Sequence, residues 1–206
     1  MSFDDPLLDR VAIEEAFTRL GERLARRGVV VDLYVFGGAA MALAYDGRRP
    51  TRDIDAVFQP HGIVLDEASA VADELGLPRW WLNEGQRLRC PRGDPGARRV
   101  FDHRGLRVAA GSPGHLLAMK VLAARRRDGD DIRFLVKHLG LTSVEAVLAP
   151  CAEIFPDEDV PDRPRLILED TIGESWLYLP ATLVGLTPQV PLTEVGSAAV
   201  ATSGRG

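Results

Sequence analysis

The feature that most constrains the fold is a short apolar run that ends in two glycines and precedes a second short run. Residues 29–36, VVVDLYVF, are β-branched and aromatic and too few for a helix, so they predict a buried strand. Gly37 and Gly38 follow, residues 39–47 have the pattern of a short helix, and residues 53–58, DIDAVF, predict a second strand. A strand, a glycine turn, a helix and a strand in this order indicate an α/β protein.

Two longer helical patterns flank this unit in the sequence. Residues 6–27 place apolar side chains at helical spacing, with Asp5 as the expected N-cap and Gly28 as the stop. Residues 61–75 form a second helical pattern, which ends at Gly76. We therefore expect a capped amphipathic helix before the first strand and another helix after the second.

The second half of the chain begins with an irregular stretch and continues with a hairpin and helices. Residues 78–97 are rich in turn residues and arginine, which predicts a long irregular connection. Residues 98–102 and 106–110 predict a β-hairpin. Ser112 provides an N-cap for the first of two or three helices expected within residues 114–155.

Together these patterns predict an α/β (α+β) fold, in which a small mixed sheet with flanking helices is followed by a helical C-terminal part. We divide the chain into a core over residues 1–112, a helical part over residues 113–156 that completes the site, and a C-terminal extension over residues 157–206. We expect roughly the last ten residues of this extension to be disordered.

The composition is that of a globular protein with a substantial core. The chain has 206 residues, of which 46% are hydrophobic and 27% charged, and this excludes global disorder. The formal net charge is −5, so any affinity for nucleic acid has to come from a local patch. Residues 79–138 could supply one, because they carry 14 basic and 6 acidic side chains inside an otherwise acidic chain.

The cysteines and the first residues predict a cytoplasmic protein that does not associate with a membrane. Cys90 and Cys151 lack the spacing of a zinc site or a disulfide framework. The N-terminus is acidic where a secretory leader is basic, and no apolar stretch approaches the roughly 18 residues that a membrane helix needs.

Asp53 and Asp55 are the most informative pair of residues. Successive strand side chains point to opposite faces, so both carboxylates leave the same face of the predicted strand. Their charges repel unless a cation neutralises them, and Mg²⁺ uses such carboxylates together with substrate phosphates. The alternative is a solvated edge strand without a ligand.

Gly37 and Gly38 predict an anion site beside this pair. They follow a buried strand and open a helix, so a phosphate could approach the backbone and bind free N–H groups. A tight turn with no ligand is the alternative. A phosphate site and a metal site on neighbouring strands are the layout that a metal–nucleotide complex needs.

A third group lies on the helices of the second half. Lys120 falls on a mainly apolar helix, where a buried ammonium needs an anionic partner such as a triphosphate or an aspartate. Arg127, Asp128 and Asp131 follow one to two turns later. From spacing alone, they could equally form an ion-pair network on the helix surface.

At this point the sequence resembles a known family. Residues 36–39, FGGA, followed by Arg49, Thr51, Asp53 and Asp55, resemble the GG…DxD signature of the minimal nucleotidyltransferases of the polymerase-beta-like superfamily. Residues 116–135 resemble the K…RDxxD segment of the AbiEii/MenT-like toxin branch, through Lys120, Ala124, Arg127, Asp128 and Asp131. The two matches together span residues 29–138.

The resemblance implies transfer of a nucleotide from an NTP with Mg²⁺ or Mn²⁺ as the metal. It implies an acceptor at the 3′ end of tRNA, a role as the toxin of a toxin–antitoxin system, and a cognate antitoxin as a partner. It assigns catalytic roles to Asp53, Asp55, Lys120 and Asp131, with Asp53 and Asp55 as metal ligands. It assigns nucleotide binding to Gly37, Gly38, Arg49, Thr51, Lys120, Arg127 and Asp128.

The sequence departs from the family pattern at two points. Many members have a serine where this chain has Gly38, and a third strand carboxylate usually completes the metal site. Asp102, at the end of a predicted hairpin strand, is the one obvious candidate for that carboxylate. We expect His115 and His138 to lie on helix surfaces.

The basic middle segment predicts an RNA contact. Arg98, Arg99 and Arg104 could bind phosphates, with Trp80 and Trp81 available to stack on bases. The alternative is a solvated arginine-rich face, with the tryptophans in the core.

Three functions therefore remain open from the sequence. The first is transfer of NMP to tRNA. The second keeps the chemistry and changes the acceptor to a protein tyrosine or an antibiotic hydroxyl. The third is a nucleotide-binding regulatory module without turnover.

Overall fold

The structure is a computed structural model that describes residues 7–47, 50–85, 93–123 and 125–156, together with residues 165, 168, 169 and 172. In these residues, five strands form one sheet in the order β3-β2-β1-β5-β4. The strands are β1 (Val31–Phe36), β2 (Ile54–Phe58), β3 (Leu82–Glu84), β4 (Arg98–His103) and β5 (Leu106–Ala110).

The sheet is mixed. The central strand β1 runs antiparallel to β2 and parallel to β5. The outer strands β3 and β4 pair parallel to β2 and antiparallel to β5, respectively. The predicted fold class, a small mixed sheet with flanking helices followed by a helical part, is confirmed, as is the hairpin.

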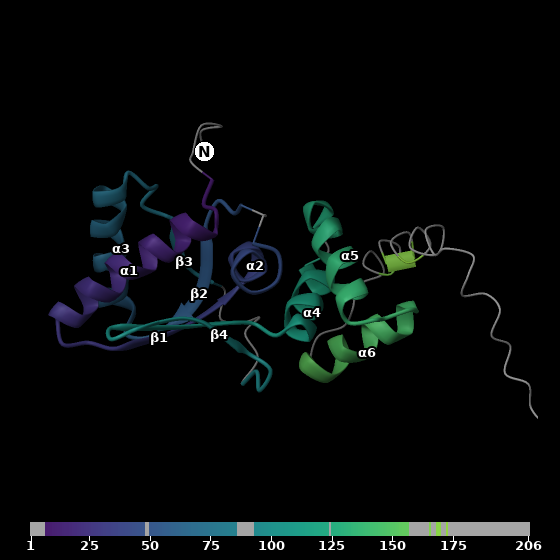
Figure 1. The fold of residues 1–206 in the computed structure, drawn as a ribbon. Helices are drawn as coiled ribbons and strands as arrows, with labels where there is room; N and C mark the ends of the chain where they lie inside the picture. The colour runs from purple at the N-terminus through teal and green to yellow at the C-terminus, as the bar shows by residue number, and fades with distance from the viewer. Residues whose placement is uncertain are drawn as a thin grey trace, which may run out of the picture.

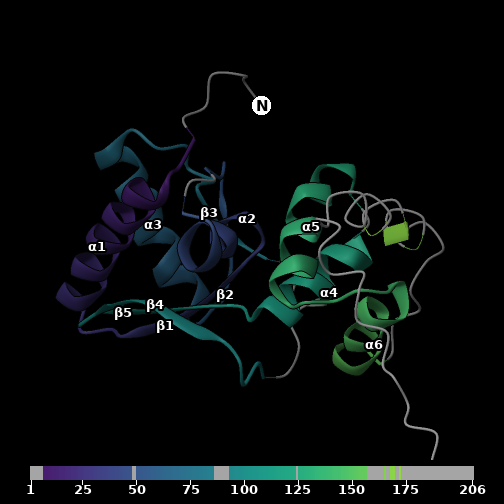
Figure 2. The same ribbon diagram turned by 45° about the vertical axis from the view of Figure 1, so that its right-hand side comes forward.

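Two long helices, α1 (Arg10–Arg26) and α3 (His61–Leu75), lie side by side against one face of the sheet (Figures 1 and 2). Helix α3 has the predicted bounds and ends at Gly76, whose φ of 66° is left-handed. Helix α1 starts later than predicted, because Asp9 rather than Asp5 is its N-cap and accepts a hydrogen bond from the Ala12 N–H.

The turn after β1 continues into a short helical segment. Gly37 has a φ of 64°, a conformation that side chains other than glycine's rarely adopt. Helix α2 (Gly37–Ala40) passes directly into a π-helical turn, η1 (Met41–Tyr45). The single helix predicted over residues 39–47 is therefore two segments that start two residues earlier and end at Tyr45.

The irregular connection predicted over residues 78–97 contains a strand. Residues Leu82–Glu84 form β3, whose Leu82 pairs with Ile54 and whose Glu84 pairs with Ala56. Trp81, just before β3, is fully buried, and its indole N–H donates to the Ala68 carbonyl oxygen over 2.8 Å. Trp81 is thus a core residue and not a surface for stacking bases.

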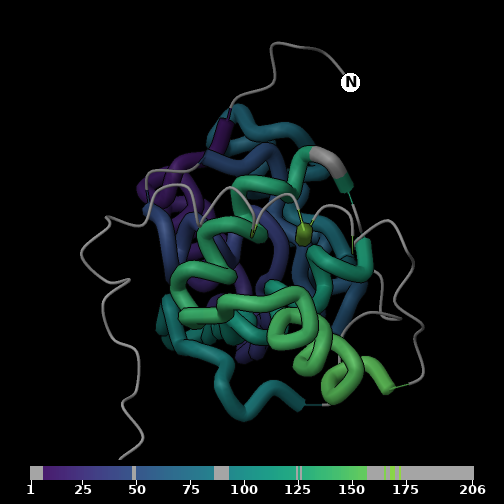
Figure 3. Tube along the Cα trace, turned by 90° about the vertical axis from the view of Figure 1, so that its right-hand side faces the viewer, coloured from purple at the N-terminus to yellow at the C-terminus, as the bar shows by residue number. Residues whose placement is uncertain are grey.

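Three α-helices follow the sheet, and Figure 3 looks onto them. They are α4 (Pro113–Ala123), α5 (Gly129–His138) and α6 (Val144–Ile154), with a short 3-10 turn, η3 (Arg126–Asp128), before α5. Helix α4 packs against both α5 and α6. The tail predicted to be disordered lies outside the described residues.

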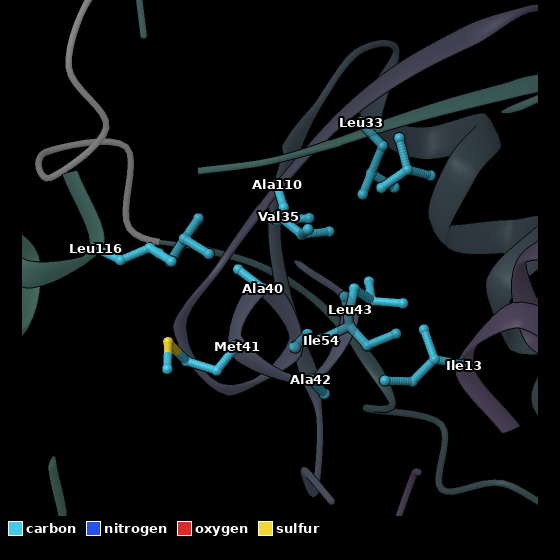
Figure 4. Close-up of a cluster of buried hydrophobic side chains, with 14 of the residues drawn as sticks. Ile13, Leu33, Val35, Ala40, Met41, Ala42, Leu43, Ile54, Ala110 and Leu116 are labelled. Carbon is cyan, nitrogen blue, oxygen red and sulfur yellow. The ribbon is translucent and has the colours of Figure 1, made fainter. Parts of the chain in front are cut away.

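One core connects the sheet to the helical part. Figure 4 shows Leu116 of α4 reaching toward Val35 of β1 and Ala110 of β5, next to Met41 of η1. All four side chains are buried to 1% exposure or less. Within the described part of the chain, no helix is long and apolar enough to cross a membrane.

Candidate active site

A cleft of about 650 Å³ lies where the carboxyl end of β1 meets the helical part. Its walls come from the turn after β1, the start of β2, the end of β3, helix α4, the segment before α5 and the first turn of α5. Its charged lining consists of five carboxylates and four cations: Asp53, Asp55, Glu84, Asp128 and Asp131, with Arg52, Lys120, Arg125 and Arg127.

Strand β2 brings the two predicted carboxylates into this cleft. Ile54 is buried in the core, while Asp53 and Asp55 on either side of it are half-buried. Asn83 of β3 lies opposite Asp55 in the sheet, and its side-chain N–H donates to Asp53 Oδ2 over 3.1 Å. The neighbouring strand therefore holds one carboxylate of the pair in place.

The carboxylate of Asp55 lacks sufficient compensating charge. Burial raises its pKa, and the negative charge of Asp53 raises it further. The positive charges of Arg125, Arg127 and Lys120 oppose this but do not outweigh it. A cation at the carboxylate pair would relieve this repulsion.

The two glycines form the floor of the cleft beside Asp55. A Cβ atom on Gly37 would lie 3.5 Å from Asp55 Oδ2, and a Cβ atom on Gly38 would lie 2.6 Å from Thr51 Oγ1. The Thr51 hydroxyl in turn donates to the Asp53 carbonyl oxygen over 3.0 Å. A side chain at position 38 would therefore force Thr51 or the backbone to shift, and glycine fits this close approach.

Thr51 has a structural role, because it forms hydrogen bonds with backbone groups. Its N–H and carbonyl pair with Leu8, and its side chain is buried to 9% exposure. Thr51 lines the cleft, so the predicted nucleotide contact remains a prediction beside this structural role. Arg49, also predicted to contact the nucleotide, lies outside the described residues.

Helix α4 carries Lys120 into the cleft with two aspartates around it. The ammonium lies 2.7 Å from Asp131 Oδ2 and 3.1 Å from Asp128 Oδ1, and the Lys120 side chain is only 8% exposed. The sequence left two alternatives open: an anionic partner for a buried lysine, or an ion-pair network on the helix surface. The structure has features of both, because Lys120 forms an ion-pair network with aspartates and this network lines the cleft. An ammonium has three donors, so one N–H remains for an anionic ligand.

Arginines stand at the mouth of the cleft. Arg52, Arg125 and Arg127 are exposed and line it. Arg127 was predicted from the sequence. Arg52 was missed, although its place next to Asp53 is visible in the sequence.

Glu84 is a cleft carboxylate that the sequence did not predict. It ends β3, and its Oε2 lies 3.3 Å from Nδ1 of His61 at the start of α3. The sequence signal was weak because β3 has only three residues and shows no periodicity.

The structure does not bring Asp102 to the cleft. Asp102 lies on β4, which is separated from β2 by β5 and β1. Its carboxylate is exposed and pairs with Arg99 over 2.9 Å. No group of three or more histidine, cysteine, aspartate or glutamate side chains that could hold a metal occurs among the described residues.

Arg98, Arg99 and Arg104 are spread along the hairpin. Arg98 lies opposite Ala110, near the cleft end of the sheet, whereas Arg104 lies in the turn at the opposite end. At about 3.4 Å per strand residue, they are separated by roughly 20 Å. All three are exposed, and none lines the cleft.

The histidine predictions have different outcomes. His138 is exposed, as predicted. His115 is buried to 7% exposure, so its predicted place on a helix surface is wrong. Helix α4 is apolar on most sides and packs into the core, which leaves His115 without a solvent face.

No model of a known protein family matches the chain, and no curated protein sequence matches it. Among solved structures, the chain is similar to the crystal structure of an antigenic nucleotidyltransferase-like protein from Paracoccidioides brasiliensis. The two share 17% sequence identity with a TM-score of 0.44, and the similarity covers 82% of this chain and 95% of that chain.

Proposed function

We propose that the chain is a metal-dependent nucleotidyltransferase that moves NMP from an NTP to an acceptor hydroxyl. The observation that supports this most is the convergence in one cleft of a carboxylate pair, a glycine turn and a buried lysine. These groups come from β2, the β1–α2 turn and α4, which lie far apart in the sequence. A metal–triphosphate complex needs ligands for the metal, which the carboxylates could provide, and contacts for the phosphates, which the glycines and the lysine could provide.

Asp53 and Asp55 are the residues that would hold Mg²⁺ or Mn²⁺. Two carboxylates with a shortage of compensating charge fit Mg²⁺, which commonly takes one or two protein carboxylates and completes its shell with water and substrate phosphates. When bound, such an ion neutralises developing phosphate charge and lowers the pKa of a coordinated hydroxyl.

The chain's own cations would orient the triphosphate. Lys120 has one N–H left beyond its two aspartates, and Arg125 and Arg127 can reach phosphates from the mouth. Gly37 and Gly38 line the cleft without side chains, so phosphate oxygens could approach their backbone. These contacts would align the bond to be broken with the acceptor.

The transfer is one displacement at phosphorus. The acceptor oxygen bonds to the α-phosphorus while the bond from that phosphorus to the oxygen bridging to the β-phosphate breaks, and pyrophosphate leaves. We assign the proton of the acceptor hydroxyl to Asp55, because its half-buried carboxylate lines the cleft beside the glycine turn.

For the acceptor, we propose the 3′ end of tRNA, in a protein that acts as a toxin restrained by an antitoxin. Support comes from the resemblance of the sequence motifs and from the exposed arginines at the cleft mouth. A single-stranded RNA end is narrow enough to enter such a cleft, and arginines suit its phosphates.

The test supplies α-labelled ATP, GTP, CTP and UTP, in turn, with Mg²⁺ and either purified tRNA or a tRNA-depleted lysate. We expect label on tRNA 3′ ends, release of pyrophosphate, and loss of both with EDTA or in Asp55→Asn. The matched control is Asp102→Asn, an exposed carboxylate outside the cleft. Label on protein or on an added aminoglycoside would change the acceptor, and saturable NTP binding without pyrophosphate release would indicate a regulatory module.

A further inference from the structure

A second buried carboxylate lies outside the cleft and has no part in the proposed chemistry. The Asp94 side chain is only 4% exposed. Its Oδ2 accepts hydrogen bonds from the Ser112 backbone N–H over 2.7 Å and from the Tyr34 hydroxyl over 2.9 Å. Its Oδ1 accepts from the Gly96 N–H over 3.1 Å. These donors come from β1, the segment before β4 and the link to α4.

The cluster lies on the connection between the sheet and the helical part. Strand β5 ends at Ala110 and helix α4 begins at Pro113, so Gly111 and Ser112 form the whole link. Besides the bond from Ser112 to Asp94, the Gly111 carbonyl accepts a hydrogen bond from the Tyr45 hydroxyl over 2.8 Å. Both linking residues are therefore tied to groups outside α4.

Two glycines allow this close packing. A Cβ atom on Gly111 would lie 2.7 Å from the Tyr34 hydroxyl, and one on Gly96 would lie 2.9 Å from Ser112 Cβ. Neither distance is compatible with a larger residue unless the neighbouring atoms shift. The Asp94 segment thus lies directly against the link.

His115 completes the cluster but does not form a serine–histidine–aspartate relay. Its Nδ1 lies 3.3 Å from Ser112 Oγ and 3.3 Å from Asp94 Oδ1. In such a relay, the serine and the acid contact different ring nitrogens. Here both contact Nδ1, while Nε2 is buried without a hydrogen-bond partner in the described residues. The arrangement points to a structural link rather than to a nucleophile.

We propose that Asp94 is a positioning residue that fixes the start of α4 and thereby the place of Lys120 relative to the carboxylate pair. Lys120 follows Ser112, the residue just before α4, by eight residues, or about 12 Å of helix rise, so a tilt of about 10° at the start would move it by about 2 Å. A misplacement of about 1 Å can cost 10²-fold in rate. This inference rests on the proposed function.

Hydrogen bonding within the cluster supports this role. Burial alone would raise the pKa of Asp94, but the bonds from Ser112 and Tyr34 and the nearby His115 hold it below its ordinary value. The carboxylate is therefore ionised at neutral pH and accepts strong hydrogen bonds. An asparagine in its place has one acceptor oxygen and cannot satisfy the same donors.

The experiment compares Asp94→Asn with two matched tyrosine variants. Tyr45→Phe removes a bond to the link, whereas Tyr34→Phe removes a bond to Asp94 and leaves the Ser112–Asp94 bond intact. We expect Asp94→Asn to lower kcat for transfer by about 10- to 100-fold with a smaller change in KM for the NTP. Tyr45→Phe should lower kcat by about threefold to tenfold, and Tyr34→Phe should change it less than twofold.

A double-mutant cycle separates positioning from general stability. In a Lys120→Ala background, Asp94→Asn should cause no further loss, because its effect passes through the lysine. Equal losses in both backgrounds, or an unchanged kcat in Asp94→Asn, would overturn the proposal. Should Asp94→Asn fail to fold, Asp94→Glu replaces it, because the longer side chain keeps the charge but displaces the acceptor of the Ser112 N–H, and an unchanged kcat in that variant would also refute the proposal.

Backbone hydrogen exchange gives a readout that does not need activity. We expect Asp94→Asn to speed exchange at the Ser112 amide and through the first turns of α4, with α1 and α3 unchanged. If the wild-type chain transfers no nucleotide, the proposed function fails, while faster exchange would still show that Asp94 holds α4. Unchanged exchange together with active wild-type protein would refute the positioning role alone.

Discussion

Two carboxylates in different parts of the molecule show how a charge cluster that is fully compensated differs from one that is not. Glu67 of α3 is 5% exposed and lies 2.5 Å from both Arg23 Nε and Arg27 Nε of α1. Burial by itself would raise its pKa, but the bonds and charges of the two arginines lower it overall. Asp55 is shifted in the opposite direction, because burial and Asp53 outweigh the cations near it.

The two clusters differ in how far opposite charges balance the buried carboxylate. Glu67 and its arginines close a contact between two helices and leave no charge deficit. The carboxylate pair of β2 remains short of positive charge, although a lysine and two arginines lie nearby. Perturbed carboxylates in a cleft are candidates for function, and the direction of the shift tells which kind of partner is missing.

The largest expected effect tests the functional side of this comparison. Asp53→Asn and Asp55→Asn should each reduce nucleotidyl transfer by about 10³-fold, because loss of a metal ligand removes several kcal/mol of charge stabilisation. Transfer is measured with labelled NTP at saturating Mg²⁺. Wild-type activity in either variant would show that the pair has only a structural role.

The next effect tests the structural side. Glu67→Gln should destabilise the fold by about 2 kcal/mol, less than the loss of a fully buried ion pair, because Arg27 is 53% exposed and Arg23 also pairs with Glu74. This corresponds to a fall in Tm of roughly 4–8 °C for a chain of this size. The exposed carboxylate variant Asp102→Asn is the control for calorimetry. Transfer per folded molecule should stay unchanged in both, and its loss in Glu67→Gln would end the distinction between the clusters.

A smaller effect compares two sets of arginines. Replacing Arg52, Arg125 and Arg127 with alanine should weaken binding of a tRNA acceptor about tenfold and reduce the slope of log Kd against log salt by about one unit for each arginine that binds a phosphate. The set Arg98, Arg99 and Arg104 serves as the comparison, because none of these lines the cleft. Binding is measured without NTP between about 50 and 200 mM salt, a range suited to such slopes. A larger loss of affinity in the second set would place the RNA on the hairpin.

The comparison also shows which parts of the fold the sequence could predict. Helix α3 matched its predicted bounds because its apolar spacing and its stop glycine are both local signals. Strand β3 was missed because three residues carry no periodicity, and its pairing with β2 is a tertiary effect. Helix α1 has Asp9 as its N-cap, and Leu8 pairs with Thr51 in a bridge, which keeps Leu8 out of the helix.

The site was predictable where one strand or one turn holds its residues. Asp53 comes just before β2 and Asp55 lies within it, on either side of Ile54, so the period of a strand is enough to place both on one face. Asp102 was a candidate third metal ligand from the sequence, but it lies away from the cleft, because strand order in a sheet is not a local property and β4 lies at the far edge. Glu84 and Asp94 were missed because their roles depend on what packs against them from other elements.

The smallest expected effect is a difference in the sign of the pH dependence of stability. The pKa of Glu67 is lowered on folding, so its contribution to stability is present above its unfolded pKa and is lost as pH falls through its folded pKa. The pKa of Asp55 is raised on folding, so its ionised form costs stability at neutral pH, and this cost disappears as pH falls through the folded pKa. Asp55→Asn should therefore raise Tm by about 1–3 °C at pH 7, and this gain should become smaller as the pH falls toward 4. Glu67→Gln should instead lower Tm, with the full loss present at pH 7 and a smaller loss below pH 4. Calorimetry in the absence of divalent ions measures both trends. A Tm deficit in Asp55→Asn at pH 7 would show that the cations of the cleft already satisfy Asp55, and the case for a missing cation at the carboxylate pair would fail.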